Sequence, residues 1–311
     1  MPRALLQHRL IFVTGKGGVG RSTVAGALGI AAASRGMRTI VAELTGECRL
    51  ARAHGVRDVR EFEELELAPG LFTISISPEH AMEEYLVVKA PGRLGHLLGH
   101  SRLFQTFAMA TPGMRELLSL GKAWELAQDH RRTHGAAPYD LVIVDAPATG
   151  HGVGMLKTPR TFSEIARVGP VAHQGQTIAA TIADRDFTGV LAVCTPEEMP
   201  VTETLSLNDA LQREQLGLDA VVVNARYPDR FKDDEQPVLA AALSSCPAPP
   251  GRAAIATAIS EHARAATQAG QEQRLHEAFP GCVLTLPFVF APVIEAEQLA
   301  LLAATLDREL A

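Results

Sequence analysis

A glycine-rich segment near the N-terminus constrains the fold of this chain more than any other feature. Residues 13–24 read VTGKGGVGRSTV, and four of the six positions from Gly15 to Gly20 are glycine. An apolar run at 10–13 precedes the segment, and the helical pattern STVAGALGIAAASRG follows its last glycine. Glycines between a strand and a helix let backbone N–H groups approach an anion at the helix N-terminus, where the helix dipole adds to the attraction. The segment therefore predicts an anion-binding turn in an α/β protein.

Short apolar runs rich in β-branched residues recur along the chain and alternate with longer helical patterns. Such runs are typical of parallel strands that are buried on both faces. The predicted strands are 10–13, 39–42, 72–76, 141–144, 190–193, 220–223 and 283–286. Helical patterns between most of them indicate βαβ units. We therefore expect an α/β fold with a mostly parallel central sheet flanked by helices.

Two connections between predicted strands are longer than a minimal βαβ unit needs. Residues 78–134 and 151–188 both have helical patterns. We interpret them as helical insertions in a single domain spanning 1–311, lying above the carboxyl ends of the strands, where ligands bind in open α/β sheets. The charged run at 229–236 and the segment CPAPPG at 246–251 are predicted to form surface loop.

The glycine loop satisfies two nucleotide-binding patterns. The phosphate-loop pattern G-x-x-x-x-G-K-[ST] ends at Ser22, although Arg21 stands at its lysine position. In that reading Ser22 binds Mg²⁺, with Thr23 beside it. The same glycines fit G-x-G-x-x-G, the dinucleotide pattern, and Glu43 ends the next predicted strand where an acid would bind a ribose of NAD.

A second motif favours the triphosphate reading. Residues 141–152 read LVIVDAPATGHG, so an apolar strand ends at Asp145 and a small, glycine-containing loop follows. A nucleotide–Mg²⁺ site needs an aspartate at a strand tip across from the loop serine. A dinucleotide fold has no use for this aspartate, and no catalytic acid or base beside a substrate domain is identifiable. An NAD-binding oxidoreductase stays as a remote alternative.

Several sequence blocks together resemble one known family. GKGGVGRST resembles the family's deviant phosphate loop GKGGVGKT/ST, and DAPATGH resembles its motif DTAPTGH. TPGMREL at 111–117 resembles its PG-x-x-E insertion motif, while PEEMPVTET at 196–204 and VVVNARYP at 221–228 resemble later blocks. On these motifs the chain is identified as a member of the arsenical-pump ATPase family, which includes the ATPases that target tail-anchored membrane proteins. The resemblance runs from Gly15 to about Pro228 and is loose beyond.

The resemblance implies a phosphate-loop NTPase that works as an ATP- and Mg²⁺-dependent dimer, with nucleotide at the subunit interface. Lys16 is then the family's signature lysine, which reaches across to the partner's phosphates. Asp145 and Ser22 hold Mg²⁺, and residues 146–151 form the switch that senses the γ-phosphate. Asn224 matches the adenine-reading asparagine, and the segment that starts at Pro287 lies near the base. The implied phosphate-binding residues are Gly15, Gly17, Gly18, Val19, Gly20, Ser22 and Thr23.

Three departures from the family pattern bear on activity. Arg21 keeps the charge of the loop lysine, but its planar guanidinium is not equivalent to an ammonium at a tight phosphate site. The switch aspartate that orients the attacking water aligns at or near Thr45, which Glu43 and Glu47 flank. The zinc-binding C-x-x-C that holds some members together as dimers is absent. The catalytic set implied by the resemblance is thus Lys16, Arg21, Thr45 and Asp145.

These features predict an ATPase switch that couples its nucleotide state to a client, membrane-protein or other protein partner, as a homodimer or a heterodimer. The alternative is a catalytically impaired subunit that pairs with a related ATPase chain. The formal net charge of −6 over 311 residues argues against a nucleic-acid partner, which calls for a basic patch. We find no signal peptide and no apolar stretch long enough to cross a bilayer, so we expect a cytoplasmic protein without direct membrane insertion.

Overall fold

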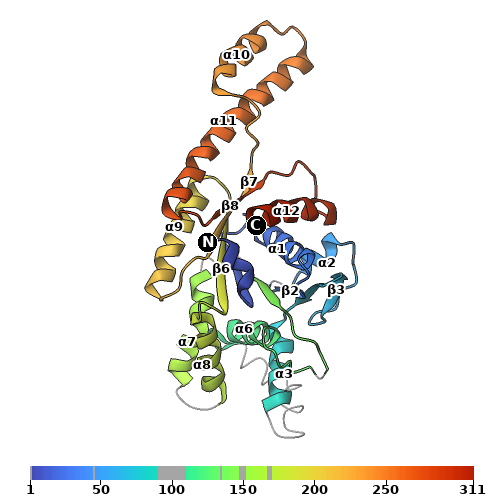
Figure 1. Cartoon of the computed structure of the whole chain (residues 1–311), viewed down its shortest axis with the longest axis vertical. Coiled ribbons are helices and arrows are strands. Elements are labelled where there is room, and N and C mark those ends of the chain that lie inside the picture. Colours follow the sequence, from blue (N-terminus) through green and yellow to red (C-terminus); the bar gives the residue numbers. More distant parts are fainter. Residues whose placement is uncertain (1, 45, 90–109, 134, 147–151, 167–169) are drawn as a thin grey trace.

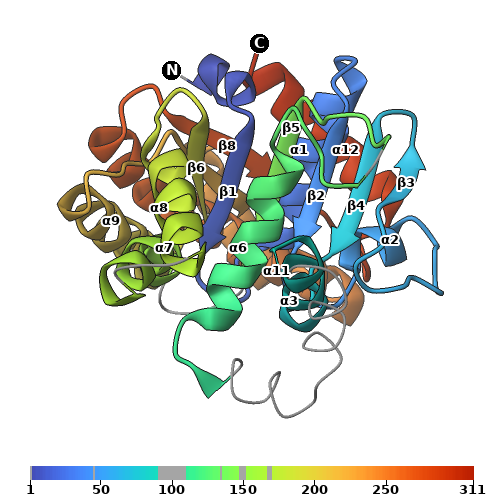
Figure 2. The same cartoon turned by 90° about the horizontal axis from the view of Figure 1, so that it is seen from below.

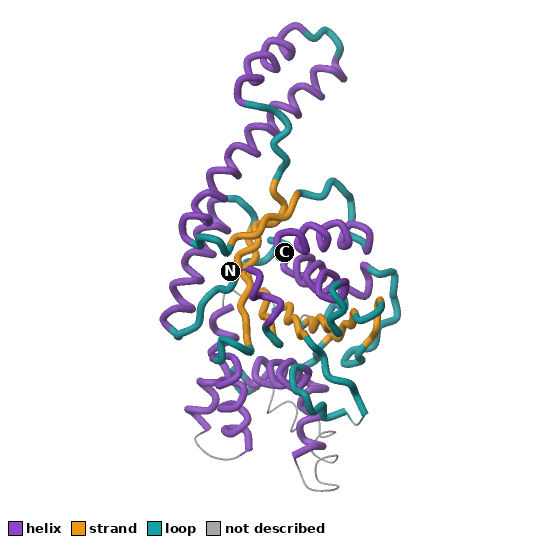
Figure 3. Tube along the Cα trace, in the orientation of Figure 1, coloured by secondary structure: helices purple, strands orange, loops and turns teal. Residues whose placement is uncertain are grey.

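The computed structural model describes residues 2–44, 46–89, 110–133, 135–146, 152–166 and 170–311. Eight strands form one sheet in the order β3-β4-β2-β5-β1-β6-β7-β8 (Figures 1 and 3). Neighbouring strands are parallel except for the edge pair β3 and β4. Their bounds are β1 Leu10–Gly15, β2 Thr39–Glu43, β3 Leu65–Ala68, β4 Leu71–Ser75, β5 Leu141–Asp145, β6 Thr188–Cys194, β7 Ala220–Arg226 and β8 Val283–Pro287.

All seven predicted strands are confirmed, and the mostly parallel α/β sheet is present. The criterion of a fully apolar run misses β3, because its residues read LELA and are only partly buried. This strand lies at the sheet edge and pairs antiparallel with β4 across a turn at Gly70, whose φ is 79°. A half-exposed edge strand does not need the apolar run of a central strand.

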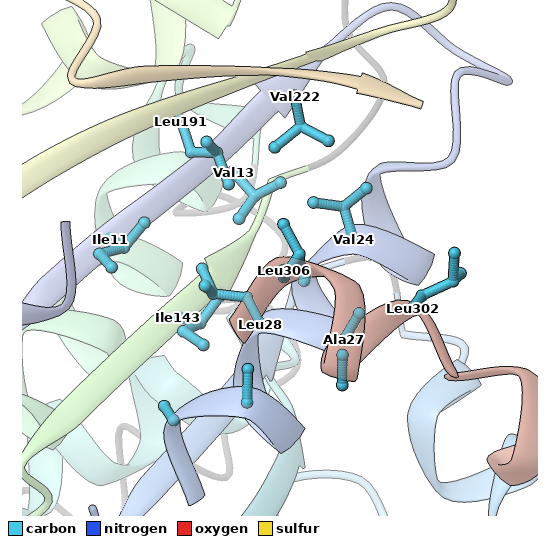
Figure 4. Close-up of a cluster of buried hydrophobic side chains, with 14 of the residues drawn as sticks. Ile11, Val13, Val24, Ala27, Leu28, Ile143, Leu191, Val222, Leu302 and Leu306 are labelled. Atoms are coloured by element: carbon cyan, nitrogen blue, oxygen red, sulfur yellow. The ribbon is translucent and has the colours of Figure 1, made fainter. Parts of the chain in front are cut away.

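One face of the sheet is covered by α1 (Arg21–Ser34) and α12 (Ala296–Glu309). The α1 helix is apolar on most of its surface because it lies between the sheet and α12 (Figure 4). Gly29 brings its backbone against Val41 of β2, where an added Cβ would lie 2.7 Å from the Val41 Cγ2 atom. Alternate residues of each central strand face this layer; Ile11 and Val13 of β1 are examples.

The opposite face is covered by helices of the two long connections: α3 (Pro78–Lys89), α6 (Met114–Leu126), α7 (Gly152–Ala166) and α8 (Pro170–Ala183). Figure 2 shows α6 crossing this face, and its Leu117 and Leu120 pack with Phe12 of β1 and Val142 of β5. Most described residues of both connections are helical. The α6 and α8 helices form a layer on the sheet face, while the N-terminal turns of α3 and α6, together with Met155 of α7, lie beside the carboxyl end of β2.

The C-terminal third adds α9 (Glu198–Arg213), α10 (Gln236–Ser245) and α11 (Pro249–Ala278). The end of α11 packs with α9, β6 and β7 through Leu275. The start of α11 and the whole of α10 form a hairpin that projects away from the sheet (Figure 1). The loop predicted at 246–251 is shorter than expected, since α11 already begins at Pro249, and proline is favoured in the first turn of a helix.

Three short elements complete the described chain: η1 (Pro2–Gln7), α2 (Arg49–Ala53) and η2 (Asp233–Glu235). The charged run at 229–236 lies on the surface, and η2 is a single turn within it. Within the described ranges, no helix combines the length and the hydropathy needed to cross a membrane.

Candidate nucleotide-binding site

The glycine loop joins the end of β1 to the start of α1 and has a backbone that only glycine tolerates at two positions. Gly15 has φ 147°, and an added Cβ would lie 2.3 Å from the carbonyl oxygen of Val193. Gly20 has φ 90°, and an added Cβ would lie 2.2 Å from the Nδ2 atom of Asn224. Both the left-handed backbone and the close approach of neighbouring chain exclude larger residues. The loop is therefore held in one shape by the strands on which it rests.

The first half of the loop faces solvent. Lys16, Gly17 and Gly18 are exposed, whereas Val19 is buried. The Lys16 Nζ donates to Glu203 Oε1 at 2.6 Å and lies 3.0 Å from the Met199 sulfur, and both partners are on α9. The side chain of the signature lysine thus points away from its own loop.

Arg21, at the lysine position, is directed into the protein. Only 8% of its surface is exposed, and its Nη1 donates to the carbonyl oxygen of Ala146 at 2.8 Å. Burial lowers the pKa of Arg21, an effect opposed by the nearby carboxylate of Asp145 and reinforced by the positive charge of Arg49. The guanidinium therefore links the first turn of α1 to the residue that follows β5.

Asp145 lies at the tip of β5, beside the loop strand. In the sheet it is paired with Val13 of β1 on one side and with Glu43 of β2 on the other. It is 1% exposed, and neither carboxylate oxygen has a hydrogen-bond partner with good geometry. Burial raises the pKa of Asp145, while the Ser22 hydroxyl, Arg21 and Arg49 oppose the rise. A buried carboxylate left without a bond is costly and suits a group that binds a cation or its water shell.

Glu43, the residue expected to bind ribose in a dinucleotide site, instead accepts hydrogen bonds from the start of α2. Its two carboxylate oxygens accept hydrogen bonds from the backbone N–H of Arg49 at 2.6 Å and of Leu50 at 3.0 Å. It is 1% exposed, and burial raises its pKa. The strand order also differs from the dinucleotide fold, in which the second strand lies beside the first. Here β5 lies between β1 and β2. The NAD alternative therefore lacks both a free ribose-binding acid and the strand order of a dinucleotide-binding fold.

A cavity of about 360 Å³ lies in front of the loop. Its lining includes Gly18, Gly20, Arg21, Ser22 and Thr23 from the loop and α1, together with Arg49 from α2, and Leu50, Ala53, Ile294 and Leu299 complete it. The structure thus brings the second half of the predicted phosphate loop to one concave surface.

Other predicted residues lie at varied distances from this cavity. The Nδ2 atom of Asn224 donates to the Val19 carbonyl at 2.9 Å, so this asparagine contacts the loop from β7. Pro287 ends β8 as an exposed residue, opposite Arg226 of β7. Thr45 and residues 147–151 of the predicted switch lie outside the described residues, so the roles expected for them stay predictions.

Sequence reasoning missed Arg49. This residue follows β2 in the stretch AELTGECRLARAHG, where only carboxylates were sought. Its Nη1 donates to the Ser22 hydroxyl oxygen at 3.3 Å, and Arg49 lines the same cavity as Gly18 and Gly20. The sequence does show a positive charge beside the predicted switch, and this charge could have indicated a phosphate-binding residue.

Comparison with known families supports the family resemblance found in the sequence motifs. The model of one family, described as anion-transporting ATPase, matches residues 8–168 and 163–243. The chain belongs to the anion-transporting ATPase family. This family matches the arsenical-pump resemblance of the sequence blocks, and the fold is the α/β phosphate-loop NTPase fold with a mostly parallel sheet.

Three relatives place the chain within the anion-transporting ATPases. ATPase BagA of Mycobacterium tuberculosis is 31% identical over 244 residues, which cover 75% of this chain and 70% of the relative. ATPase GET3 of Podospora anserina is 23% identical over 265 residues, covering 73% of this chain and 76% of the relative. ATPase GET3 of Candida glabrata is 26% identical over 253 residues, covering 70% and 72%. All three carry the name ATPase.

Proposed function

We propose that this chain binds ATP with Mg²⁺ at the loop between β1 and α1 and hydrolyses it. We further propose that it acts as a dimer whose nucleotide state controls the binding of a client or partner protein. Family membership supports ATP chemistry in general. The cavity in front of the loop supports its location, because it is lined by the loop backbone and by the hydroxyl-bearing residues Ser22 and Thr23.

The observation that carries the proposal is the orphaned carboxylate of Asp145. Both of its oxygens are buried without a hydrogen bond of good geometry, at a strand tip next to the loop strand, and the nearby Ser22 hydroxyl and two arginines offset only part of the cost of burial. Ser22 and Asp145 are the residues that would hold Mg²⁺. When bound, this ion neutralises charge on the phosphate oxygens. A dinucleotide site or an empty glycine turn would leave the cost of burying Asp145 unexplained.

The remaining loop residues divide the work of binding. Backbone N–H groups from Gly18 to Thr23 orient phosphate oxygens at the start of α1. Lys16 is held by an ion pair with Glu203 in which both side chains are about half exposed, at 40% and 46%. Such pairs contribute about 0–1 kcal/mol, so the Lys16 ammonium is readily transferred to the phosphates of a partner subunit.

A second candidate function is an impaired subunit that binds nucleotide and pairs with a related ATPase chain. The direction of Arg21 favours it, because the guanidinium is bonded to the Ala146 carbonyl and is largely buried. In this state Arg21 lines the cavity, but its guanidinium is bonded to the residue that follows β5. Such a subunit would lend Lys16 in trans to the competent chain while turning over little ATP itself.

The test is ATP binding and phosphate release by the purified chain with Mg²⁺, beside Lys16→Ala, Arg21→Lys and Asp145→Asn. Sedimentation with and without ATP reports the oligomeric state. Turnover that is lost in Lys16→Ala supports a homodimeric ATPase. Tight binding without turnover, in both wild type and Arg21→Lys, supports the impaired subunit and leads to a search for the partner chain. If ATP does not bind, both candidates are wrong.

A further inference from the structure

Arg49 faces the nucleotide loop from outside it. It begins α2, lines the same cavity as Gly18, Gly20 and Thr23, and donates to the Ser22 hydroxyl oxygen at 3.3 Å. Arg49 lies in the stretch that aligns with the family's switch aspartate, but the resemblance assigns no role to this residue. Its position nevertheless puts a guanidinium beside Ser22, in the cavity that the loop glycines also line.

The backbone of Arg49 is fixed by a hydrogen bond to Glu43 at the end of β2. Buried Glu43 accepts hydrogen bonds from the N–H groups of both Arg49 and Leu50, and so holds the start of α2. Leu50 is itself buried, with its Cδ1 atom 2.9 Å from where a Cβ on Gly26 would stand. The Cα position of Arg49 is therefore set by contacts with the end of β2 and with α1, the helix that begins at the loop.

The side chain of Arg49, in contrast, is held weakly. Its Nε donates to Glu47 Oε2 at 2.7 Å, and both side chains of this pair are about half exposed, at 51% and 52%. An exposed pair of this kind contributes little to stability, because water screens the attraction and both long side chains lose freedom. A phosphate with more negative charge than one carboxylate can replace Glu47 as the partner, because a guanidinium binds phosphate oxygens in a two-pronged, charge-assisted arrangement.

The other two cations near the loop have partners outside the cavity lining. Arg21 donates to the Ala146 carbonyl and is largely buried, and Lys16 pairs with Glu203 on α9 and does not line the cavity. Of the described cavity-lining residues, Arg21 and Arg49 are the cationic ones. Arg49 is the more exposed of the two and the one whose guanidinium reaches Ser22.

We propose that Arg49 binds the β- and γ-phosphates of a nucleotide in the same subunit, releasing Glu47, and supplies an exposed positive charge beside that of the largely buried Arg21. The proposal rests on the proposed function, since it requires nucleotide at this loop. It also makes the segment that follows β2 a sensor of phosphate, because Arg49 moves from a carboxylate on its own segment to the ligand.

The experiment measures the affinity of the full chain for ATP, ADP and AMP with Mg²⁺ by calorimetry. The variants are Arg49→Ala, Arg49→Lys and Glu47→Gln, and the matched control is Arg52→Ala, an exposed arginine on the same short helix. We expect Arg49→Ala to weaken ATP binding at least tenfold and to change AMP binding less than twofold. Arg49→Lys restores part of the loss, and Arg52→Ala stays within twofold of wild type.

Glu47→Gln separates a phosphate ligand from a merely structural ion pair. If Arg49 exchanges partners, removing the Glu47 charge tightens ATP binding about twofold to threefold. If the pair is structural, Glu47→Gln weakens ATP binding in the same direction as Arg49→Ala, and the proposal is wrong. Equal ATP affinity in Arg49→Ala and Arg52→Ala also overturns it, while leaving the nucleotide site intact. Absence of ATP binding by the wild type overturns the proposed function first. Thermal unfolding without nucleotide confirms that each variant is folded.

Discussion

The glycine loop and the α10–α11 hairpin differ in what determines their conformations. In the loop, Gly15 and Gly20 have left-handed backbones pressed against neighbouring strands, and the adjoining strand tips are buried. In the hairpin, no described residue of α10 is buried, and burial along α11 begins only at His262. Residues 236–260 contain one charged residue, Arg252, and many alanines. The loop is shaped by contacts with the rest of the molecule, whereas the hairpin relies on the helix preference of its own residues.

Substitutions in the two regions should therefore affect the stability of the protein differently. A change in the loop must disturb the strands beneath it, because its shape is set by them. A change in the hairpin is felt locally, since segments with few buried contacts open at low free energy without unfolding the rest. We therefore expect substitutions in the loop and in the hairpin to have effects of different size and sign.

Gly20→Ala should have the largest effect. The added Cβ would meet the Asn224 amide at 2.2 Å on a backbone with φ 90°. We expect nucleotide binding to be lost and the free energy of unfolding to fall by about 2–3 kcal/mol. Chemical denaturation and calorimetry with ATP measure the two effects. A variant with wild-type stability and ATP affinity would show that the loop is not held against β7.

Asp145→Asn should stabilise the protein without nucleotide and abolish the effect of Mg²⁺ on ATP binding. At neutral pH the substitution removes a buried charge whose burial outweighs the favourable effect of Ser22, Arg21 and Arg49, which we expect to raise the free energy of unfolding by about 1 kcal/mol. Loss of stability in Asp145→Asn, or an unchanged response to Mg²⁺, would contradict the assigned role.

The pH dependence of the same pair of proteins follows from the raised pKa of Asp145, which burial causes. The folded state holds this proton more tightly than the unfolded state, whose carboxyl has a pKa of about 3.9. Stability from this group is present at low pH and is lost as pH rises from the unfolded to the raised folded pKa. Denaturation at several pH values should show wild type falling relative to Asp145→Asn across that window. Curves that stay parallel would contradict the shift.

Gly270→Ala should act in the opposite sense to Gly20→Ala. Gly270 lies inside α11, is exposed, and has open space where a Cβ would stand. Alanine is favoured over glycine in a helix interior by about 1 kcal/mol, so we expect a gain of up to that size in the free energy of unfolding. Denaturant titration measures it, with ATP affinity as the control that should not change.

Shortening the hairpin should have the smallest effect on the body. The rings of Phe231 and His262 lie 6.4 Å apart at its base, so a short glycine linker can replace residues 233–260. We expect the stability of the body and the ATP affinity to stay within about 1 kcal/mol of wild type, because the hairpin contributes no buried side chain to the body. Loss of cooperative unfolding would show that the hairpin supports the core.

Much of the fold was predictable because buried parallel strands and a glycine loop leave strong local patterns. Asp145 was also predictable, since a polar residue that ends an apolar strand is conspicuous. The partners of Lys16 and Arg21 were not, because Glu203 and Ala146 are distant in sequence and the direction of a long side chain depends on tertiary packing. The projecting hairpin was missed for the opposite reason: alanine-rich sequence with prolines has no apolar periodicity that says what it packs against.

The continuity of α11 has a mechanical consequence. This helix has 30 residues without a break, which corresponds to about 45 Å at 1.5 Å per residue. Its inner half is bonded to the end of β7, through Glu272 to Arg226 and through Gln268 to the backbone of Tyr227. Two residues before Arg226 on that strand, Asn224 holds the loop carbonyl of Val19. A force on the projecting end of α11 would therefore be transmitted along the helix to β7, the strand that contacts the glycine loop.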